Sequence, residues 1–141
     1  MPGLICQGGT GEMDQHKLRY LLVAAAAILG AAGVSLAAVA AHRVESPALA
    51  TAASMLMIHA GAGIGIAGFS AKSQRPNWWS IVVAAMLASV ALFSGDIAFN
   101  TLAGVHLFPM AAPTGGSLLI GSWMAVALCA LAEFKGTRRE P

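Results

Sequence analysis

Four long apolar runs dominate the chain, and short polar segments separate them. The runs cover about residues 18–41, 48–70, 78–103 and 113–134. An α-helix of about 20 residues spans a hydrocarbon core of about 30 Å, so each run is long enough to cross a membrane. The pattern therefore predicts an all-α membrane protein whose four transmembrane helices form one bundle over residues 18–134.

The segments that flank and separate the runs are polar. Residues 1–17 are rich in glycine and show no periodicity, so we expect a flexible N-terminal tail, with Met13 as an alternative start. We expect residues 135–141 to form a polar C-terminal tail. Ser46 followed by Pro47 has the pattern of a helix N-cap and first helical residue. The first run follows basic residues, as in a signal peptide, but it exceeds the usual apolar length of about 7–15 residues, so we expect a retained helix.

Basic residues are distributed unequally between the two ends of the predicted bundle. Arg43 flanks one end. Seven basic residues flank the other end: Lys17, Arg19, Lys72, Arg75, Lys135, Arg138 and Arg139. Segments rich in Lys and Arg remain on the cytoplasmic side of a membrane. We therefore expect both termini in the cytoplasm, and the alanine-rich composition suggests a bacterial inner (plasma) membrane.

Composition agrees with a membrane location. Of the residues, 57% are hydrophobic and 10% are charged, whereas soluble domains contain about 25% charged residues. Abundant glycine and alanine suit helices that pack closely within a lipid bilayer. A net charge of +2 is too small to indicate nucleic-acid binding. Cys6 and Cys129 lie far apart, which indicates neither a disulfide framework nor a zinc site.

The third apolar run contains an aspartate, Asp96. A carboxylate within a membrane helix is costly, so it normally faces the protein interior and has a partner. Ser89 and Asn100 lie seven residues before and four residues after it, and they share its helical face. The pattern is compatible with two roles. One is a proton or ligand site that faces the bundle interior, and the other is a hydrogen-bonded clamp between helices or to a partner protein.

Three histidines accompany this aspartate. His59, near the middle of the second run, is either a satisfied histidine at a close helix crossing or part of a relay with Asp96, directly or through water. His42 and His106 belong to the outer half, but no pair has the spacing of metal ligands, and His59 lacks a partner at matching depth for haem. We therefore expect no metal and no cofactor. The candidate intramembrane polar site comprises His42, His59, Asp96 and Asn100.

Small residues recur at helical spacing. Gly61 and Gly65 form a small-xxx-small pair that Gly68 extends, as at close helix crossings. The fourth run begins with Pro113-Thr114-Gly115-Gly116, which favours a tight turn into a closely packed helix; alternatively, the free backbone N–H groups there face Asp96 or a small polar ligand. Trp123, in the middle of that run, is expected to pack against other helices. The glycines expected in helix packing are Gly61, Gly65, Gly95, Gly115, Gly116 and Gly121.

Four short motifs occur in a recognisable order. They are residues 38–42 (AVAAH), 57–60 (MIHA), 92–95 (LFSG) and 113–123 (PTGGSLLIGSW). Their order and spacing resemble the domain of unknown function 423 family, also called uncharacterised protein family 0382. Its members are small four-helix inner-membrane proteins, similar to the eukaryotic transmembrane protein 256.

The resemblance covers about residues 18–134 and implies the same fold and location, with no established activity. It places His42 and His59 at the histidine positions of the family. It also places Ser94-Gly95 and Gly115-Gly116 at the family's glycine motifs. The chain departs from the family pattern at Asp96, where a small serine is common.

The sequence shows no nucleotide-binding loop, no Gly-x-Ser-x-Gly motif and no pair of carboxylates, so we expect no enzymatic activity. We expect a non-enzymatic accessory or structural subunit of a larger membrane complex. Its partners would be other membrane-protein subunits, or a second copy in a homo-oligomer. The alternative is a small oligomeric transporter or proton-linked carrier that uses Asp96 and His59.

Overall fold

The computed structural model describes residues 9–73 and 75–137 of the chain. Its elements are α1 (Gly9–His42), α2 (Pro47–Phe69), the short 3-10 helix η1 (Ser70–Lys72), α3 (Pro76–Ala103) and α4 (Ala111–Thr137). All four α-helices are long and apolar enough to cross a membrane. The predicted all-α, four-span membrane architecture is therefore confirmed.

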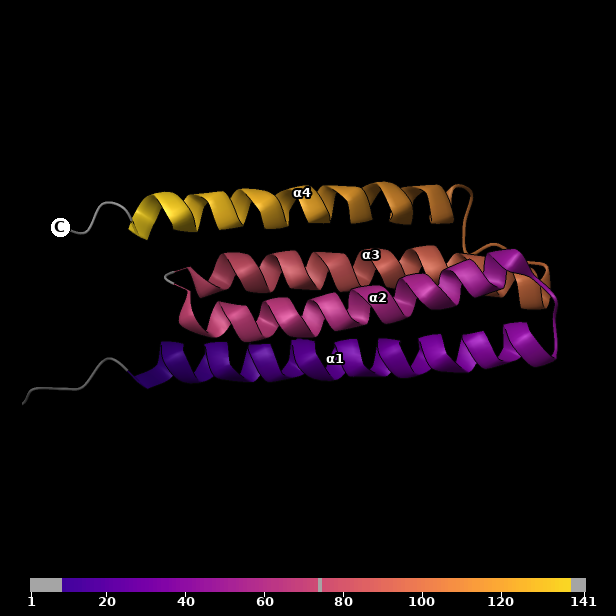
Figure 1. Ribbon diagram of the computed structural model, residues 1–141, viewed down its shortest axis with the longest axis horizontal. Coiled ribbons are helices and arrows are strands. Elements are labelled where there is room, and N and C mark those ends of the chain that lie inside the picture. Colours follow the sequence, from indigo (N-terminus) through magenta and orange to yellow (C-terminus); the bar gives the residue numbers. More distant parts are fainter. Residues whose placement is uncertain (1–8, 74, 138–141) are drawn as a thin grey trace, which may run out of the picture.

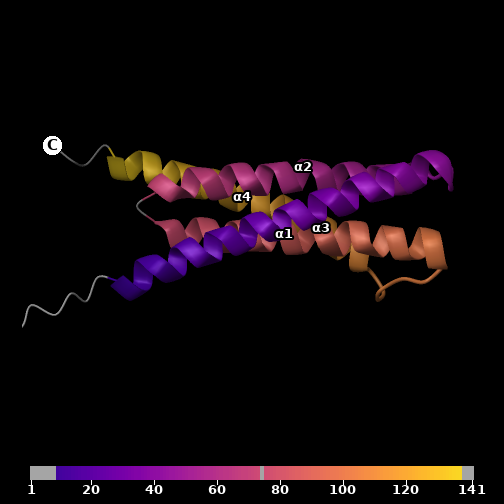
Figure 2. The same cartoon turned by 90° about the horizontal axis from the view of Figure 1, so that it is seen from below.

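The four helices run alternately up and down, so both ends of the described chain lie at the same end of the bundle (Figure 1). In the two views, α2 and α3 form a central layer, with α1 against one face and α4 against the other (Figures 1 and 2). We refer to the end with both termini as the terminal end, and to the end with the α3–α4 connector as the connector end.

Two apolar clusters hold the layers together. In the first, Leu22 and Ala26 of α1 pack against Val83 and Leu87 of α3. The second consists of Leu56, Met86, Val90 and Leu119, from α2, α3 and α4. The outer helices α1 and α4 bury few of their apolar residues within the described chain. Most of the surface of α1 and α4 is therefore left for lipid or for another protein.

Glycines allow α1 and α2 to approach each other closely. A Cβ at Gly33 would lie 3.0 Å from the carbonyl oxygen of Ala53, and a Cβ at Gly30 would lie 3.4 Å from the Cβ of Ala60. Backbones in lipid associate through such small residues because tight packing replaces the missing hydrophobic driving force. The contact between α1 and α2 thus depends on Gly33, which the sequence analysis did not select, whereas the distance at Gly30 is that of an ordinary contact.

The start of α2 agrees with its sequence signal. Pro47 is the first helical residue, and the Ser46 hydroxyl accepts a hydrogen bond from the Leu49 N–H at 3.2 Å. At the same end of the bundle, the connector end, α3 ends at Ala103 and is followed by Gly104, whose φ of 69° lies in the left-handed region. Glycine adopts this conformation without the steric cost of a Cβ, which makes it a common helix terminator.

The two tails differ from the prediction. Helix α1 already begins at Gly9, so the flexible tail expected over residues 1–17 is helical from there onward. Asp14, near the positive end of the helix dipole, and a 2.7 Å hydrogen bond between Arg19 and His16 favour this extension. Helix α4 likewise continues to Thr137, into the expected polar tail. The rest of both tails lies outside the described residues.

Candidate functional site

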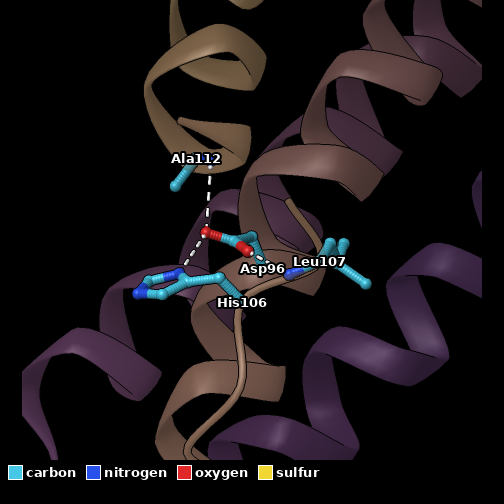
Figure 3. A network of polar contacts seen from close by, with 4 residues as sticks. All are labelled: Asp96, His106, Leu107 and Ala112. Atoms are coloured by element: carbon cyan, nitrogen blue, oxygen red, sulfur yellow. Dashed lines mark hydrogen bonds and ion pairs between the residues drawn. The ribbon is translucent and has the colours of Figure 1, made fainter. Parts of the chain in front are cut away.

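Asp96 forms the centre of the largest polar network at the connector end (Figure 3). Its side chain is buried, with 2% of its surface exposed. Oδ1 accepts a hydrogen bond from the Leu107 N–H at 2.8 Å. Oδ2 accepts one from His106 Nδ1 at 3.0 Å and one from the Ala112 N–H at 3.3 Å. All three donors belong to the connector or to the first turn of α4, so this carboxylate joins α3 to the segment that follows it.

The backbone of the connector brings these donors to Asp96. After Gly104 the chain turns back along α3, and Met110, with a φ of 69°, redirects it into α4. The Ala112 N–H is one of the first amides of a helix, which lack partners within the helix itself. A carboxylate at this position also lies near the positive end of the helix dipole. Asp96 therefore caps α4 and fixes the connector, as an intramolecular clamp.

Glycine at position 115 allows α4 to start directly against α3. A Cβ at Gly115 would lie 2.6 Å from the backbone N and 2.9 Å from the Cα of Phe93. At Gly116 the nearest atom, Cδ2 of Phe93, would be 3.6 Å away, which is an ordinary contact. Gly95 lies next to the connector, and a Cβ there would lie 3.8 Å from Cδ1 of Leu107. The tight turn expected at the start of the fourth helix is a close backbone contact one turn from Asp96.

The other three glycines expected in helix packing do not pack within the described chain. A Cβ at Gly61, Gly65 or Gly121 would have no atom within 4 Å outside its own helix. These positions lie on the outer faces of α2 and α4, so their part in helix packing stays a prediction that would need a helix from another chain. Gly63 faces inward instead, and a Cβ there would lie 3.1 Å from Cδ2 of Leu87.

His59 is buried and has both ring nitrogens occupied. Trp123 Nε1 donates a hydrogen bond to His59 Nε2 at 3.1 Å, so the proton of the neutral ring is on Nδ1. Nδ1 then donates to the Met55 carbonyl oxygen at 2.7 Å. The rings of His59 and Trp123 meet edge to face, with centroids 6.0 Å apart. Trp123, expected as a packing residue, therefore also links α4 to α2 by a hydrogen bond.

The structure does not bring the residues of the candidate intramembrane polar site together. The hydrogen bonds of His59 lead to α4 and those of Asp96 to the connector, so the direct relay between them is not formed among the described contacts. Asn100 and His42 are exposed. Ser89 is buried and donates within its own helix, to the Ala85 carbonyl oxygen. Of the outer polar residues considered, the structure joins Asp96 and His106.

Glu133 makes a polar contact that the sequence analysis missed. The Ser73 hydroxyl donates a hydrogen bond to Glu133 Oε1. Trp79 Nε1 donates to the same oxygen at 3.4 Å. The sequence contained a signal for this contact, because Glu133 is an acidic residue within the fourth apolar run and Trp79 is the second residue of the third. Polar contacts therefore attach α4 at three levels, through Asp96, through Trp123 and through Glu133.

These arrangements connect helices within the described part of the chain. There, no three His, Cys, Asp or Glu side chains are grouped so that they could hold a metal ion. Both oxygens of Asp96 accept hydrogen bonds, and so the carboxylate acts as an anchor for the connector. Through its hydrogen bond with His106, whose side chain is 60% exposed, the buried carboxylate is linked to the surface.

A family model described as "Protein of unknown function (DUF423)" matches residues 29–116. This match covers well over half of the chain, so the chain belongs to that family. It includes the C-terminal part of α1 from residue 29 onward, all of α2 and α3, the connector and the start of α4. No curated protein and no solved structure matches the chain.

Proposed function

We propose that this member of the DUF423 family is a non-enzymatic accessory or structural subunit of a larger membrane complex. We also propose a bacterial inner membrane as its location, with both termini in the cytoplasm. The unequal distribution of basic residues supports this orientation: Lys17, Arg19, Lys72 and Arg75 all lie at the terminal end.

The observation that best supports this proposal is the open glycine edge of α2. Gly61, Gly65 and Gly68 follow one another at helical spacing, and a Cβ at each would meet no atom within 4 Å outside its own helix. Ile58 and Ile64 flank this edge and are 60% and 41% exposed. In membranes such small-xxx-small edges allow a second helix to approach closely. Since none of the four described helices covers the edge, a helix of a partner subunit is the occupant that we propose.

The hydrogen bonds of the buried polar groups agree with an accessory or structural role. Asp96, His59 and Glu133 all make hydrogen bonds that connect α4 to the other helices. Polar groups of this kind rigidify a membrane domain because an unpaired polar group is costly in lipid. A rigid bundle that presents an apolar, glycine-lined edge is suited to assembly.

The alternative of a proton-linked carrier is favoured by one observation, the hydrogen bond between buried Asp96 and exposed His106. A carrier would need this pair to exchange protons with the outer side. The variant Asp96→Asn distinguishes the two functions. A carrier loses flux and still assembles, whereas an accessory subunit with a weakened connector assembles less well and has no flux to lose.

The direct test of the glycine edge is the double variant Gly61→Leu/Gly65→Leu, expressed in native membranes and purified in mild detergent. We expect the co-purifying partner to be lost, because two leucine side chains prevent the close helix approach. Gly121→Leu is the matched control. It also replaces an open glycine, but it lies two residues, or about 200°, around α4 from Trp123, away from α2. Retention of the partner by the double variant would refute the proposed interface.

A further inference from the structure

The connector between α3 and α4 (residues 104–110) exposes apolar side chains, although it is not helical. It contains no Asp, Glu, Lys or Arg. The loop between α1 and α2 (residues 43–46) lies at the same end of the bundle and contains Arg43 and Glu45. Apolar residues gathered on a surface indicate a contact with another molecule or with a membrane. Those of the connector are between 44% and 69% exposed and comprise Val105, Leu107, Phe108 and Met110.

The length of α3 places the connector at the level of a membrane boundary. Lys72 and Arg75 precede α3, and its first turn contains Trp78, an exposed tryptophan of the kind that collects at the level of lipid headgroups. Asp96 lies 20 residues after Pro76, which is about 30 Å further along the helix. The hydrocarbon core of a bilayer has about this thickness. When the start of α3 lies at one boundary, Asp96 therefore lies at the opposite one.

The connector is held at the level of Asp96 because it folds back along α3 (Figures 1 and 2). Leu107 lies beside Gly95, and its N–H donates a hydrogen bond to Asp96 Oδ1 at 2.8 Å (Figure 3). The Ala112 N–H, at the start of α4, donates to Asp96 Oδ2. Asp96 lies seven residues, or about 10 Å, before Ala103, the last residue of α3. The connector therefore lies beside the last two turns of α3 and not beyond them.

The charged loop between α1 and α2 lies further out than the connector. The Ser94 hydroxyl donates a hydrogen bond to the Ala52 carbonyl oxygen at 3.0 Å, so these two residues lie at the same level of α3 and α2. Since the two helices are antiparallel, Asp96 is level with a point three residues, or about 5 Å, inside Pro47, where α2 begins. The charged loop is thus shallower and the uncharged connector deeper, which is the order that a membrane boundary favours because charges are costly in lipid.

The backbone of the connector restricts its depth to the headgroup layer. The amides of Val105 and Phe108 have no partner in the part of the chain that the structure describes. Irregular backbone with unpaired amides does not occur in the hydrocarbon core, where water is absent. Exposed Leu107 and Met110, in contrast, are unfavourable in bulk water. Water and acyl chains are both within reach at the boundary between headgroups and hydrocarbon.

We propose that the connector is an interfacial membrane segment, whose apolar side chains enter the phospholipid leaflet at the connector end. Its unpaired amides and exposed His106 remain in contact with the water of the headgroup layer. Asp96 supplies acceptors to the Leu107 and Ala112 amides at a depth where water is scarce. This assignment depends neither on the accessory role nor on which end of the bundle faces the cytoplasm.

The test is spin labelling of the full chain, reconstituted alone into vesicles of phosphatidylethanolamine and phosphatidylglycerol. Labels are attached in Phe108→Cys and in Met110→Cys, in a chain whose two native cysteines are replaced by serine. Collisions of each label with oxygen, which concentrates in lipid, are compared with collisions with a water-soluble nickel chelate. We expect both labels to lie about 5–10 Å below the headgroup boundary, as apolar faces of interfacial segments do. Val44→Cys, in the charged loop of the same end, is the matched control and should lie in water.

A second label position and a second variant complete the test. Met124→Cys, at an exposed position within α4, marks the hydrocarbon core and should lie deeper than either connector label. In Asp96→Asn we expect the label at position 108 to move outward and to collide more often with the nickel chelate, while the label at position 124 is unaffected. An unchanged depth at position 108 would remove the role of Asp96.

Two results would overturn the membrane assignment. If the labels at positions 108 and 110 collide with the nickel chelate as often as the label at position 44, the connector lies in water. If they are protected from both reagents, protein covers them, and this protein is a second copy because the vesicles contain no other chain. The connector would then be a protein interface and not a membrane segment.

Discussion

The close contact between Gly115 and Phe93 predicts that even one methyl group at this position destabilises the bundle. In Gly115→Ala, the new Cβ would lie 2.6 Å from a backbone nitrogen, which no rotamer change can move away. Restoring an ordinary contact requires the start of α4 to move by about 0.8 Å. The hydrogen bond from the Ala112 N–H to Asp96, already 3.3 Å long, would lengthen with it.

Two opposing effects determine how much Gly115→Ala changes the free energy of unfolding. Overpacking costs about 1–3 kcal/mol, and we expect the upper part of this range because the clash is with backbone. Replacing a helical glycine by alanine stabilises the helix by about 1 kcal/mol. Gly121→Ala gains the helix stabilisation without the overpacking, since its Cβ meets nothing within 4 Å. The difference between the two variants therefore isolates the packing cost, which we expect to be about 2–3 kcal/mol in the free energy of unfolding.

The assay is reversible unfolding of each variant by sodium dodecyl sulfate in mild detergent micelles, followed by circular dichroism. We expect the order of stability to be Gly121→Ala, then wild type, then Gly115→Ala. Gly116→Ala, where the nearest contact is an ordinary 3.6 Å, should be about as stable as Gly121→Ala, because it gains the same helix stabilisation without a clash. If Gly115→Ala is as stable as Gly121→Ala, α4 does not start against Phe93 and the account of the connector end is wrong.

Two further predictions concern the polar contacts of α4. Trp123→Phe removes the donor to buried His59 and should lower the free energy of unfolding by about 1–2 kcal/mol, whereas Trp78→Phe, at an exposed tryptophan, should change it little. In Asp96→Asn the amide NH₂ must face at least one of the three donors, so hydrogen–deuterium exchange at the Leu107 amide should become faster. An unchanged exchange rate at Leu107 would contradict the clamp.

Hydrophobic patterning predicted the fold because a lipid bilayer strongly restricts which sequences can cross it. A membrane helix needs about 20 apolar residues and satisfied backbone groups, and both leave a visible pattern. The start of α2 at Ser46-Pro47 was also predictable from the sequence, since the capping hydrogen bond joins residues only three positions apart. The start of α1 was misjudged because glycines suggested a flexible tail, although the residues from Asp14 onward support a helix.

The candidate site was predictable in part. Asp96 was conspicuous as an acid within an apolar run, yet two of its three partners are backbone amides, which have no sequence signature. Between these two amides Met110 adopts a positive φ, a conformation that methionine rarely takes and that the residue pattern did not predict. His59 and Trp123 were both noted, but their pairing depends on the relative rotation of two helices.

The glycines show the same limit of sequence reasoning. Helical spacing correctly grouped Gly61 and Gly65 on one edge, but it did not reveal whether that edge faces the bundle or the lipid. The positions in closest contact, Gly33 and Gly115, lie outside the obvious small-xxx-small pair. Because the edge of α2 faces outward, the pattern that suggested internal packing now supports a contact with another protein.

The central claim, an accessory role in a larger complex, is tested most directly by purifying the wild-type chain from native membranes in mild detergent. The size of the particle and the proteins within it would be determined by light scattering and mass spectrometry. We expect a stoichiometric complex with at least one larger membrane protein, cross-linked through the glycine edge of α2. A homogeneous particle that contains this chain alone, whether monomer or homo-oligomer, would contradict the accessory role and favour a self-contained carrier.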